Sequence, residues 1–353
     1  MTRMKGYILL GALLFTASVL LGGSPVLAKE DKTKLPVEEE YPGHKVDEDM
    51  KPLRATGKPL TMSYGGWITP VVIDQRESNV ELATSLTTAK IWAKSTLWSG
   101  SHIYVRVKDD YQAVIKEKNI DLKNENIVDL DVGYISMASE KGAVSLAMGR
   151  KFFYLGTGLI LNGRGDGAEL DIYSGILDLK LMGAYTGLLK KDNNPYGLSY
   201  ADYSDGARRI FAGGAMEKRI GNQTLYLMGL AQIDRGKEEE NTKTRYQSQY
   251  YGGGLRGILS DSLDYYGEFV YETGKSYLSG STEQKDVKAY AGLAGISYFL
   301  KTAFNPALIL HYAYGSGDKD RNNYKSSTAN AADDDTGFLS FGTYIGGYAL
   351  RPV

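Results

Sequence analysis

The sequence predicts an all-β protein, a transmembrane antiparallel β-barrel of about fourteen strands. From residue 62 onward, segments of roughly ten residues alternate apolar with polar side chains, which is the length and period of a tilted strand that crosses a membrane. The 353 residues include 42 Gly and 27 Tyr, and Gly lies well above its usual share of about 7%. Gly permits strands to approach and bend, and Tyr suits the boundary between lipid and water, so the composition agrees with a barrel.

The first residues have the features of a secretory signal peptide. Arg3 and Lys5 precede an uncharged apolar run over residues 6–21, and residues 26–28, V-L-A, form a small-residue cleavage site. The apolar run is short for a membrane-spanning helix, which makes a retained anchor the weaker alternative. We therefore expect residues 1–28 to be a signal peptide that directs export.

The next stretch, residues 29–61, is charged, contains several Pro residues and shows neither strand nor helix periodicity. We expect a flexible lead-in in the periplasm, followed by the barrel over residues 62–353. Residues 351–353, R-P-V, lack the terminal aromatic residue on which barrels of this class usually end. Either the barrel closes within this chain, or the sequence is a fragment that lacks C-terminal strands, and we favour the fragment.

Connection length alternates strictly between short and long along the predicted barrel. Short periplasmic turns and long outer loops produce this order, and it places the lead-in in the periplasm. The first predicted strand covers residues 62–73 and the last covers residues 338–348. The short connections are residues 99–100, 140–141, 175–176, 220–222, 260–262 and 300–305, and the long ones are residues 74–86, 110–128, 155–168, 188–207, 235–246, 274–285 and 316–337.

The alternation also separates two faces. Along residues 263–273 the odd positions are mostly apolar or aromatic, and three of the even positions are acidic; residues 287–299, 103–107 and 89–97 alternate in the same manner. A Lys or Arg that faces lipid at mid-membrane costs about 2 to 4 kcal/mol, so we expect the charged face to line the lumen. The predicted lumen-lining residues are Lys90, Lys94, Arg106, Lys108, Lys180, Arg256, Asp264, Glu268, Glu272 and Lys288.

Charge and residue counts exclude several classes of protein. The 41 basic and 42 acidic residues give no basic excess, so we expect no nucleic-acid partner. The absence of Cys excludes disulfides and thiolate metal sites. Of the three His residues, His102 and His311 fall on strands, and neither has an assignable catalytic partner in the sequence. We expect no enzyme activity.

One loop has oxygen-bearing side chains at alternate positions, the spacing that can surround Ca²⁺. These residues are Asp318, Asp320 and Asn322. The loop fails as an EF-hand because its sixth position is Asn323 rather than Gly and its twelfth is Ala329 rather than Glu. We favour hydrated loop carboxylates, and a weak Ca²⁺ site on the outer surface stays a hypothesis.

Two stretches resemble the alginate-export family of outer-membrane porins. Residues 149–164, G-R-K-F-F-Y-L-G-T-G-L-I-L-N-G-R, are similar to a strand of that family that runs into a Gly-rich loop. Residues 310–320, L-H-Y-A-Y-G-S-G-D-K-D, resemble its tyrosine-rich strand and loop, which Asp335 and Phe338 follow. The resemblance implies a monomeric barrel in the cell outer membrane, with 16–18 strands when complete, and its well-understood members export an acidic polysaccharide through a basic lumen.

This sequence departs from that basic lumen because its predicted lining mixes both signs of charge. A ring of one sign is needed to favour one class of ion, so we carry over the fold and the transport role but not alginate. We expect an outer-membrane porin or exporter that gives passive passage to hydrophilic solutes, polysaccharide included, contacts membrane lipid and needs no cofactor. The alternatives are a structural barrel, the sleeve of an electron conduit and, more weakly, an adhesin or an outer-membrane hydrolase.

Overall fold

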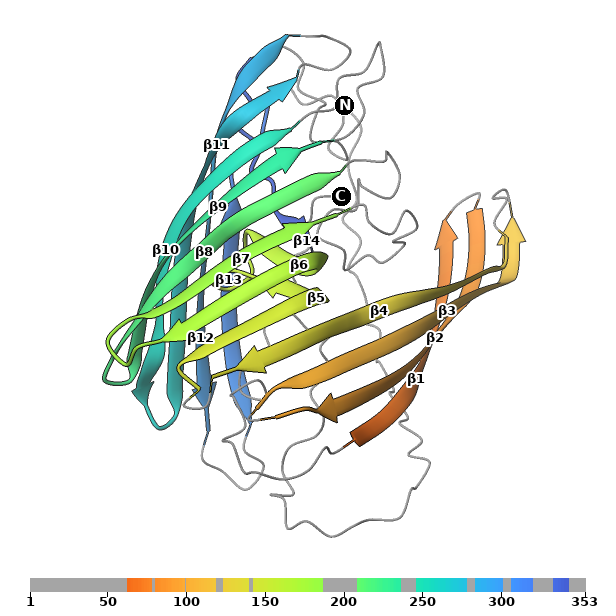
Figure 1. Cartoon of the computed structure of the whole chain (residues 1–353). Helices are drawn as coiled ribbons and strands as arrows, with labels where there is room; N and C mark the ends of the chain where they lie inside the picture. The colour runs from red at the N-terminus through yellow and green to blue at the C-terminus, as the bar shows by residue number, and fades with distance from the viewer. Residues whose placement is uncertain are drawn as a thin grey trace. The chain divides into compact units, whose positions relative to one another are not determined.

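The computed structural model describes residues 62–77, 80–98, 100–118, 123–139, 142–186, 208–235, 246–277, 283–300, 306–319 and 333–342. The predicted signal peptide and lead-in, residues 1–61, lie outside these ranges. The described chain is all-β, as expected, and forms one 14-stranded sheet (Figure 1). Across the described ranges, we find no helix that is long and apolar enough to cross a membrane.

The strands follow one another in the sheet in the order of the sequence from β1 to β13, and these two strands are the ends of that order. Every consecutive pair from β4 to β13 is antiparallel. The strands are β1 (Met62–Glu77), β2 (Val80–Thr96), β3 (His102–Lys118), β4 (Glu125–Ala138), β5 (Val144–Tyr154), β6 (Leu161–Tyr173), β7 (Asp178–Tyr185), β8 (Arg209–Ile220), β9 (Gln223–Asp234), β10 (Gln247–Ser260), β11 (Leu263–Tyr277), β12 (Gln284–Phe299), β13 (Ala307–Gly315) and β14 (Phe341–Gly342).

The chain divides into two compact units, which we describe separately. The first unit contains residues 64–92 and 107–129, and the second contains the other described residues. In the first unit, Lys90 and Lys108 are buried, while Ile91 and Val107 beside them are exposed. The Lys90 ammonium lies 5.7 Å from the centre of the Trp67 ring, so the aromatic face supports this buried charge.

Most short connections agree with the prediction. β8 and β9 are joined by Gly221 and Asn222 alone, and Gly221 has φ 59°, a conformation that suits glycine. The long connections over residues 188–207 and 235–246 are also confirmed, since β7 ends at Tyr185, β8 begins at Arg209 and β10 begins at Gln247.

Three other predicted long connections are wrong, and a fourth is shorter than expected. Residues 74–86 belong mostly to β1 and β2, residues 110–118 belong to β3, β6 already begins at Leu161, and only residues 278–283 separate β11 from β12. In the first unit the reason is visible. Asp110, which we assigned to a loop, accepts a hydrogen bond from Thr88 Oγ1 at 2.7 Å and pairs with Lys108 Nζ at 2.5 Å. Charged residues remain on these strands because neighbouring side chains pair with them.

The predicted last strand is also wrong. Phe341 and Gly342 do not extend the antiparallel order but pair in parallel with Leu161 and Asn162 of β6. Apolar side chains at both parities explain this, because Leu339 and Phe341 are buried and Phe338 packs beside them. The rest of the predicted strand, residues 343–348, lies outside the described residues.

The second unit has two faces, which the strand register defines. Glu268 on β11 lies opposite Gly254 and Leu293, and Glu272 lies opposite Tyr250 and Ala289. Directly opposite residues point to the same side of a sheet. We call the side of these residues the inner face, because the hydrophobic core lies there. We call the other side the outward face.

The outward face of β9 to β13 is apolar and aromatic. Its large exposed side chains stand at alternate positions, and the Phe269, Tyr290 and Tyr314 rings follow one another across three strands with centroids 6.4 and 5.8 Å apart. Other exposed members are Leu225, Leu227, Tyr251, Leu255, Tyr271, Ile296, Leu308, Leu310 and Tyr312. Such a face suits lipid.

Glycines on the inner face make room for tyrosine rings. A Cβ on Gly295 of β12 would overlap the ring of Tyr266 on β11, which lies directly opposite. We predict that Gly295→Ala lowers the free energy of unfolding by about 1 to 3 kcal/mol through overpacking. In a Tyr266→Ala background the same substitution should cost much less. Urea unfolding of the refolded protein in detergent, analysed as a double-mutant cycle, measures the difference.

Gly229→Ala is the control for this cycle, because the nearest atom to its Cβ would be the Tyr250 carbonyl oxygen at an ordinary 3.7 Å. Equal costs of Gly295→Ala with and without the Tyr266 ring would contradict this explanation.

A substitution at Leu227 tests whether the outward face contacts lipid. Leu227 is 58% exposed in the middle of β9, between Met216 and Gly253 on the neighbouring strands. We predict that Leu227→Arg lowers the free energy of unfolding in lipid vesicles by about 2 to 4 kcal/mol, because a guanidinium at mid-membrane loses its hydration. Asn222→Arg, in the turn before the same strand, should have little effect. Similar unfolding midpoints for the two variants would argue against lipid contact at Leu227.

Candidate functional site: a charged, tyrosine-rich inner face

Glu272 on β11 is a fully buried carboxylate of the inner face. Its Oε1 accepts hydrogen bonds from the hydroxyls of Tyr246 and Tyr250, the second at 2.7 Å, and its Oε2 accepts one from the backbone N–H of Leu339 at 2.9 Å. Burying a carboxylate is costly unless hydrogen bonds replace its water. The three donors supply that replacement, so they hold segments that are distant in sequence around one side chain.

Glu268, four residues earlier on the same face of β11, is organised in the same manner. Its Oε2 accepts hydrogen bonds from the Tyr226 hydroxyl at 2.5 Å and from the backbone N–H of Thr157 at 2.7 Å. Tyr226 fits because Gly254 opposite it has no side chain. Gly156 has φ 59° and a Cβ there would overlap the Glu268 carboxylate. The connection between β5 and β6 therefore contacts β11 at Gly156 and Thr157, which both lie against the Glu268 carboxylate.

Basic side chains of the second unit are held in ion pairs. Arg106 Nε and Arg164 Nη1 both lie 2.6 Å from Asp131 carboxylate oxygens, and all three side chains are almost completely buried. Lys151 Nζ lies 2.5 Å from Glu169 Oε1. Further pairs join Lys180 to Glu169 at 3.7 Å, Arg150 to Asp166 at 2.7 Å, Arg209 to Asp234 at 3.4 Å and Arg256 to Glu217 at 2.8 Å.

The structure brings four of the predicted lumen-lining residues onto one face. Arg256, Asp264, Glu268 and Glu272 all lie on the inner face, because Arg256 stands opposite Tyr266 and the others alternate with it along β11. Among the remaining residues of the second unit, Arg106 and Lys180 take part in the ion pairs above, and Lys94 on β2 is half-buried. Lys90 and Lys108 are buried within the first unit.

Lys288 differs from the prediction. It lies opposite Thr273 and is exposed, whereas Val287, Ala289 and Ala291 of the same strand are buried on the inner face. We expected the apolar set of β12 to face lipid and its charged set to face the lumen. The faces are reversed because the small apolar residues of this strand contribute to the internal core, and Lys288 instead pairs with Asp334 at 2.8 Å.

Several residues of the inner face escaped sequence reasoning. The composition linked tyrosine in general to the lipid boundary. Tyr226, Tyr246 and Tyr250 are instead buried donors to the two glutamates. Lys151 and Glu169 were missed because their strands mix small, apolar and charged residues on one face, so the alternation is weak. The period of two cannot reveal such residues. Only the register across strands can.

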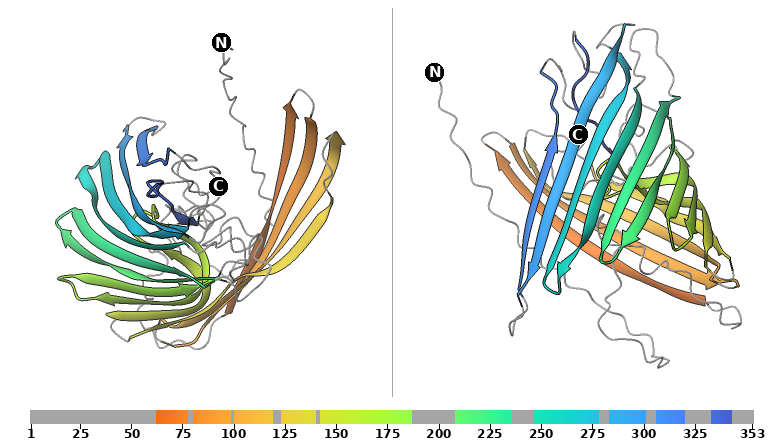
Figure 2. Two further views of the ribbon diagram at one scale, coloured as in Figure 1. Left: turned by 90° about the horizontal axis from the view of Figure 1, so that it is seen from above. Right: turned by 90° about the vertical axis from the view of Figure 1, so that its left-hand side faces the viewer.

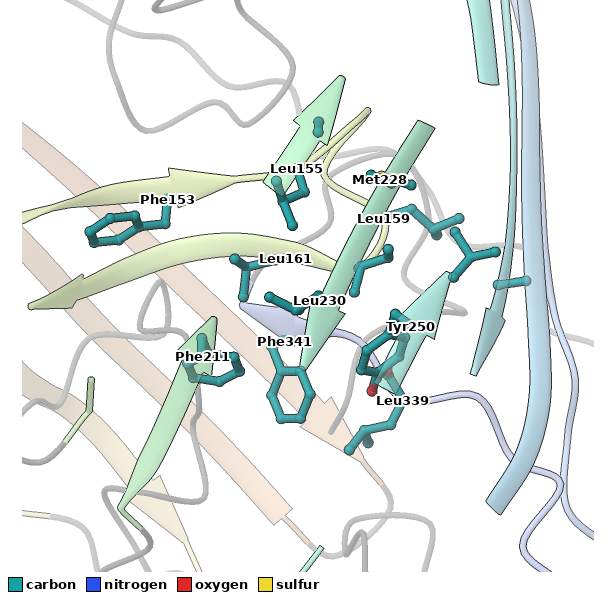
Figure 3. Packing of buried hydrophobic residues seen from close by; sticks show 14 of the residues in the cluster. Phe153, Leu155, Leu159, Leu161, Phe211, Met228, Leu230, Tyr250, Leu339 and Phe341 are labelled. Carbon is teal, nitrogen blue, oxygen red and sulfur yellow. Dashed lines mark hydrogen bonds between the residues drawn. The ribbon is translucent and has the colours of Figure 1, made fainter. Parts of the chain in front are cut away.

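The inner face is filled by side chains in its middle. Residues from β5 to β12, the connection before β6 and the segment before β14 form one hydrophobic cluster, in which Phe211, Tyr250, Leu339 and Phe341 meet (Figure 3). The rings of Phe211 and Phe341 are 5.0 Å apart and nearly perpendicular. Charged side chains therefore surround a dry core.

The proposed Ca²⁺ ligands cannot be compared as a set, because Asp320 and Asn322 lie outside the described residues. Asp318 accepts a hydrogen bond from the backbone N–H of Thr336 at 3.0 Å and lines a hollow of about 590 Å³. Lys285, Lys319, Asp333 and Asp334 also line that hollow. Within the described ranges, no group of three or more acidic or His residues has the arrangement of a metal site. The Ca²⁺ site stays a prediction.

An apolar, aromatic outward face and an inner face of paired charges and tyrosines define a protein whose strands cross a lipid bilayer. Residues 198–351, which contain β8 to β14, match the family model described as alginate export. The match includes the second of the two sequence motifs, at residues 310–320, and confirms the resemblance drawn from it. The protein is thus an outer-membrane protein with a transport role.

Solved structures of outer-membrane proteins are similar at a distance. OmpT of Vibrio cholerae, in vitro folded and in trimer form, is 11% identical with a TM-score of 0.37, covering 80% of this chain and 96% of that chain. A Vibrio cholerae OmpT mutant that lacks loop L8 is 12% identical with a TM-score of 0.36, covering 72% and 93%. No curated protein matches the chain.

A substitution at Asp131 tests how much the buried ion pairs contribute to stability. We predict that Asp131→Ala lowers the free energy of unfolding by about 3 to 5 kcal/mol, because Arg106 and Arg164 lose the carboxylate that they share inside the protein. Asp286→Ala is the matched control, since its pair with Lys275 is exposed and should contribute little. Urea unfolding in detergent measures both variants. A small cost at Asp131 would mean that the cluster is accessible to water.

Proposed function

We propose that the protein gives passive passage to hydrophilic solutes across the outer membrane, with the inner face of the second unit as part of the lining. The observation that carries this proposal is the contrast between the two faces. Leu225 and Leu227 are more than half exposed on the outward face of β9, whereas the inner face carries Glu268, Glu272 and Arg256. Lipid on one side and water with charge on the other reproduce this contrast.

The lining carries both positive and negative side chains. This mixture favours passage of solutes of either charge, not selectivity for cations or for anions. Arg256 is paired with Glu217, and Lys151 and Lys180 share Glu169, so cations do not form a ring of one sign. The alginate-export family suggests polysaccharide as the larger candidate solute. A polyanion would meet the partly exposed Glu217 and Asp264 beside these cations, and we therefore place small hydrophilic solutes first.

Planar-bilayer recordings test the proposal directly. We expect the refolded protein to conduct, and we expect Arg256→Glu to shift the reversal potential in a salt gradient toward cation preference, because two units of charge change on the inner face. Lys218→Glu makes the same change of charge on the outward face, opposite Leu225, and should shift it far less.

Complete absence of conductance would contradict the proposed function. Equal shifts from Arg256→Glu and Lys218→Glu would instead contradict the assignment of the two faces. Adding short uronate oligomers to one side then distinguishes the candidate solutes, since a polysaccharide path should show interruptions of the current and a small-solute path should not.

A further inference from the structure

Residues 333–342, which we call the inner segment, cross the inner face of the second unit. At one end the backbone of Asp335 is bridged to β12, where it accepts from Lys288 N–H at 2.9 Å and donates to the Asp286 carbonyl at 2.8 Å. At the other end Phe341 N–H donates to the Ile160 carbonyl at 2.8 Å, next to β6. Figure 2 shows β14, in dark blue, on the concave side of the strands of the second unit. The segment thus spans from β12 to β6.

The inner segment fills the space that a passage would need. Leu339 and Phe341 are 8% and 4% exposed. Their neighbours include Tyr250, whose ring lies 6.0 Å from Phe338 and 6.2 Å from Phe341 in edge-to-face geometry. The connection at residues 155–160 closes the same region from the other side through Thr157 and Glu268. In this arrangement the middle of the inner face excludes water.

Few regular backbone contacts hold the inner segment. β14 pairs with β6 over two residues, and a single isolated bridge joins Asp335 to Val287. By contrast, β10 and β11 pair along almost their whole lengths. Elements with few ladder hydrogen bonds open locally at lower free energy than strands in a sheet. Release of the segment exposes the apolar side chains of Leu339 and Phe341, but it leaves the ladder hydrogen bonds of the wall intact.

Two side chains of the wall bind the centre of the inner segment. Leu339 N–H donates to Glu272 at 2.9 Å, and the Leu339 carbonyl accepts from the Tyr250 hydroxyl at 2.8 Å. The same Tyr250 hydroxyl lies 2.7 Å from Glu272 Oε1, so Glu272 and the Leu339 carbonyl share its single proton. When the segment leaves, Glu272 keeps both tyrosine donors, Tyr246 and Tyr250, and water can replace the single Leu339 N–H. The Glu272 carboxylate therefore has hydrogen-bond donors both when the inner segment is in place and when it has left.

We propose that the inner segment is a releasable plug of the passage, held at Leu339 by Glu272 and Tyr250. This inference rests on the proposed passive passage and adds that the passage is closed in the conformation described above. Conduction then depends on displacement of residues 333–342, not only on the width of the sheet.

Because the chain has no Cys, an engineered disulfide can lock the plug. Leu161→Cys with Phe341→Cys joins two backbone partners of β6 and β14. We expect low conductance when this variant is oxidised and an increase of about threefold or more on reduction, because the path opens only when the segment leaves. Ala212→Cys with Ala231→Cys joins opposite residues of β8 and β9 and should conduct equally in both states.

Hydrogen exchange of the unmodified protein is the second measurement, and it does not depend on folding of the variant. We expect the amides of Leu339 and Phe341 to exchange about tenfold faster or more than that of Val270 on β11, because local opening exposes only the segment. Glu272→Gln should accelerate exchange at Leu339 further, since a neutral amide oxygen accepts more weakly than a carboxylate.

The outcomes separate the two proposals. Equal conductance of the locked and reduced variant, with a conducting wild type, would overturn the plug, and so would protection of Leu339 equal to that of Val270. Absence of current in every variant, with fast exchange at Leu339, would overturn the proposed passage and leave only a mobile segment.

Discussion

The antiparallel backbone ladder from β4 to β13 is the constraint on which the rest of the structure depends. In lipid, backbone N–H and C=O groups have no water to bind, so each strand must form hydrogen bonds with its neighbours. The ladder fixes the register, and the register decides which side chains share a face. Opposite residues such as Gly254 and Glu268, or Gly295 and Tyr266, become neighbours through it, although they are distant in sequence. Glycine then gives room for tyrosine on the same face.

Charged residues of the second unit are stabilised in two different ways. The basic residues have carboxylate partners, as in the Arg106, Asp131 and Arg164 cluster, where the close geometry compensates for lost hydration. Glu268 and Glu272 instead receive tyrosine hydroxyls and backbone N–H groups. These neutral donors join the two carboxylates to irregular segments, through the backbone N–H groups of Thr157 and Leu339.

The outward and inner faces together connect the fold to transport. Apolar and aromatic residues cover the outside of β9 to β13, while the inside combines paired charge with a dry core that two irregular segments complete. A simple water-filled lumen would not bury Phe341 or Leu339. The inner face is better described as a sheet surface covered by the inner segment, which we propose can leave. In that proposal the passage suggested by the alginate-export match is occupied rather than open.

The sequence by itself determined the all-β class, the approximate positions of the strands, the acidic inner face of β11 and the resemblance of its C-terminal part to the alginate-export family. These follow from the period of two and from local motifs. The tertiary structure decided the rest. It placed Lys288 on the outward face, extended β1 to β3 through charged residues and turned residues 338–342 into the core. Periodicity separates two faces of a strand but does not say which of them meets lipid, because that depends on partners across the ladder and on segments that fold back over it.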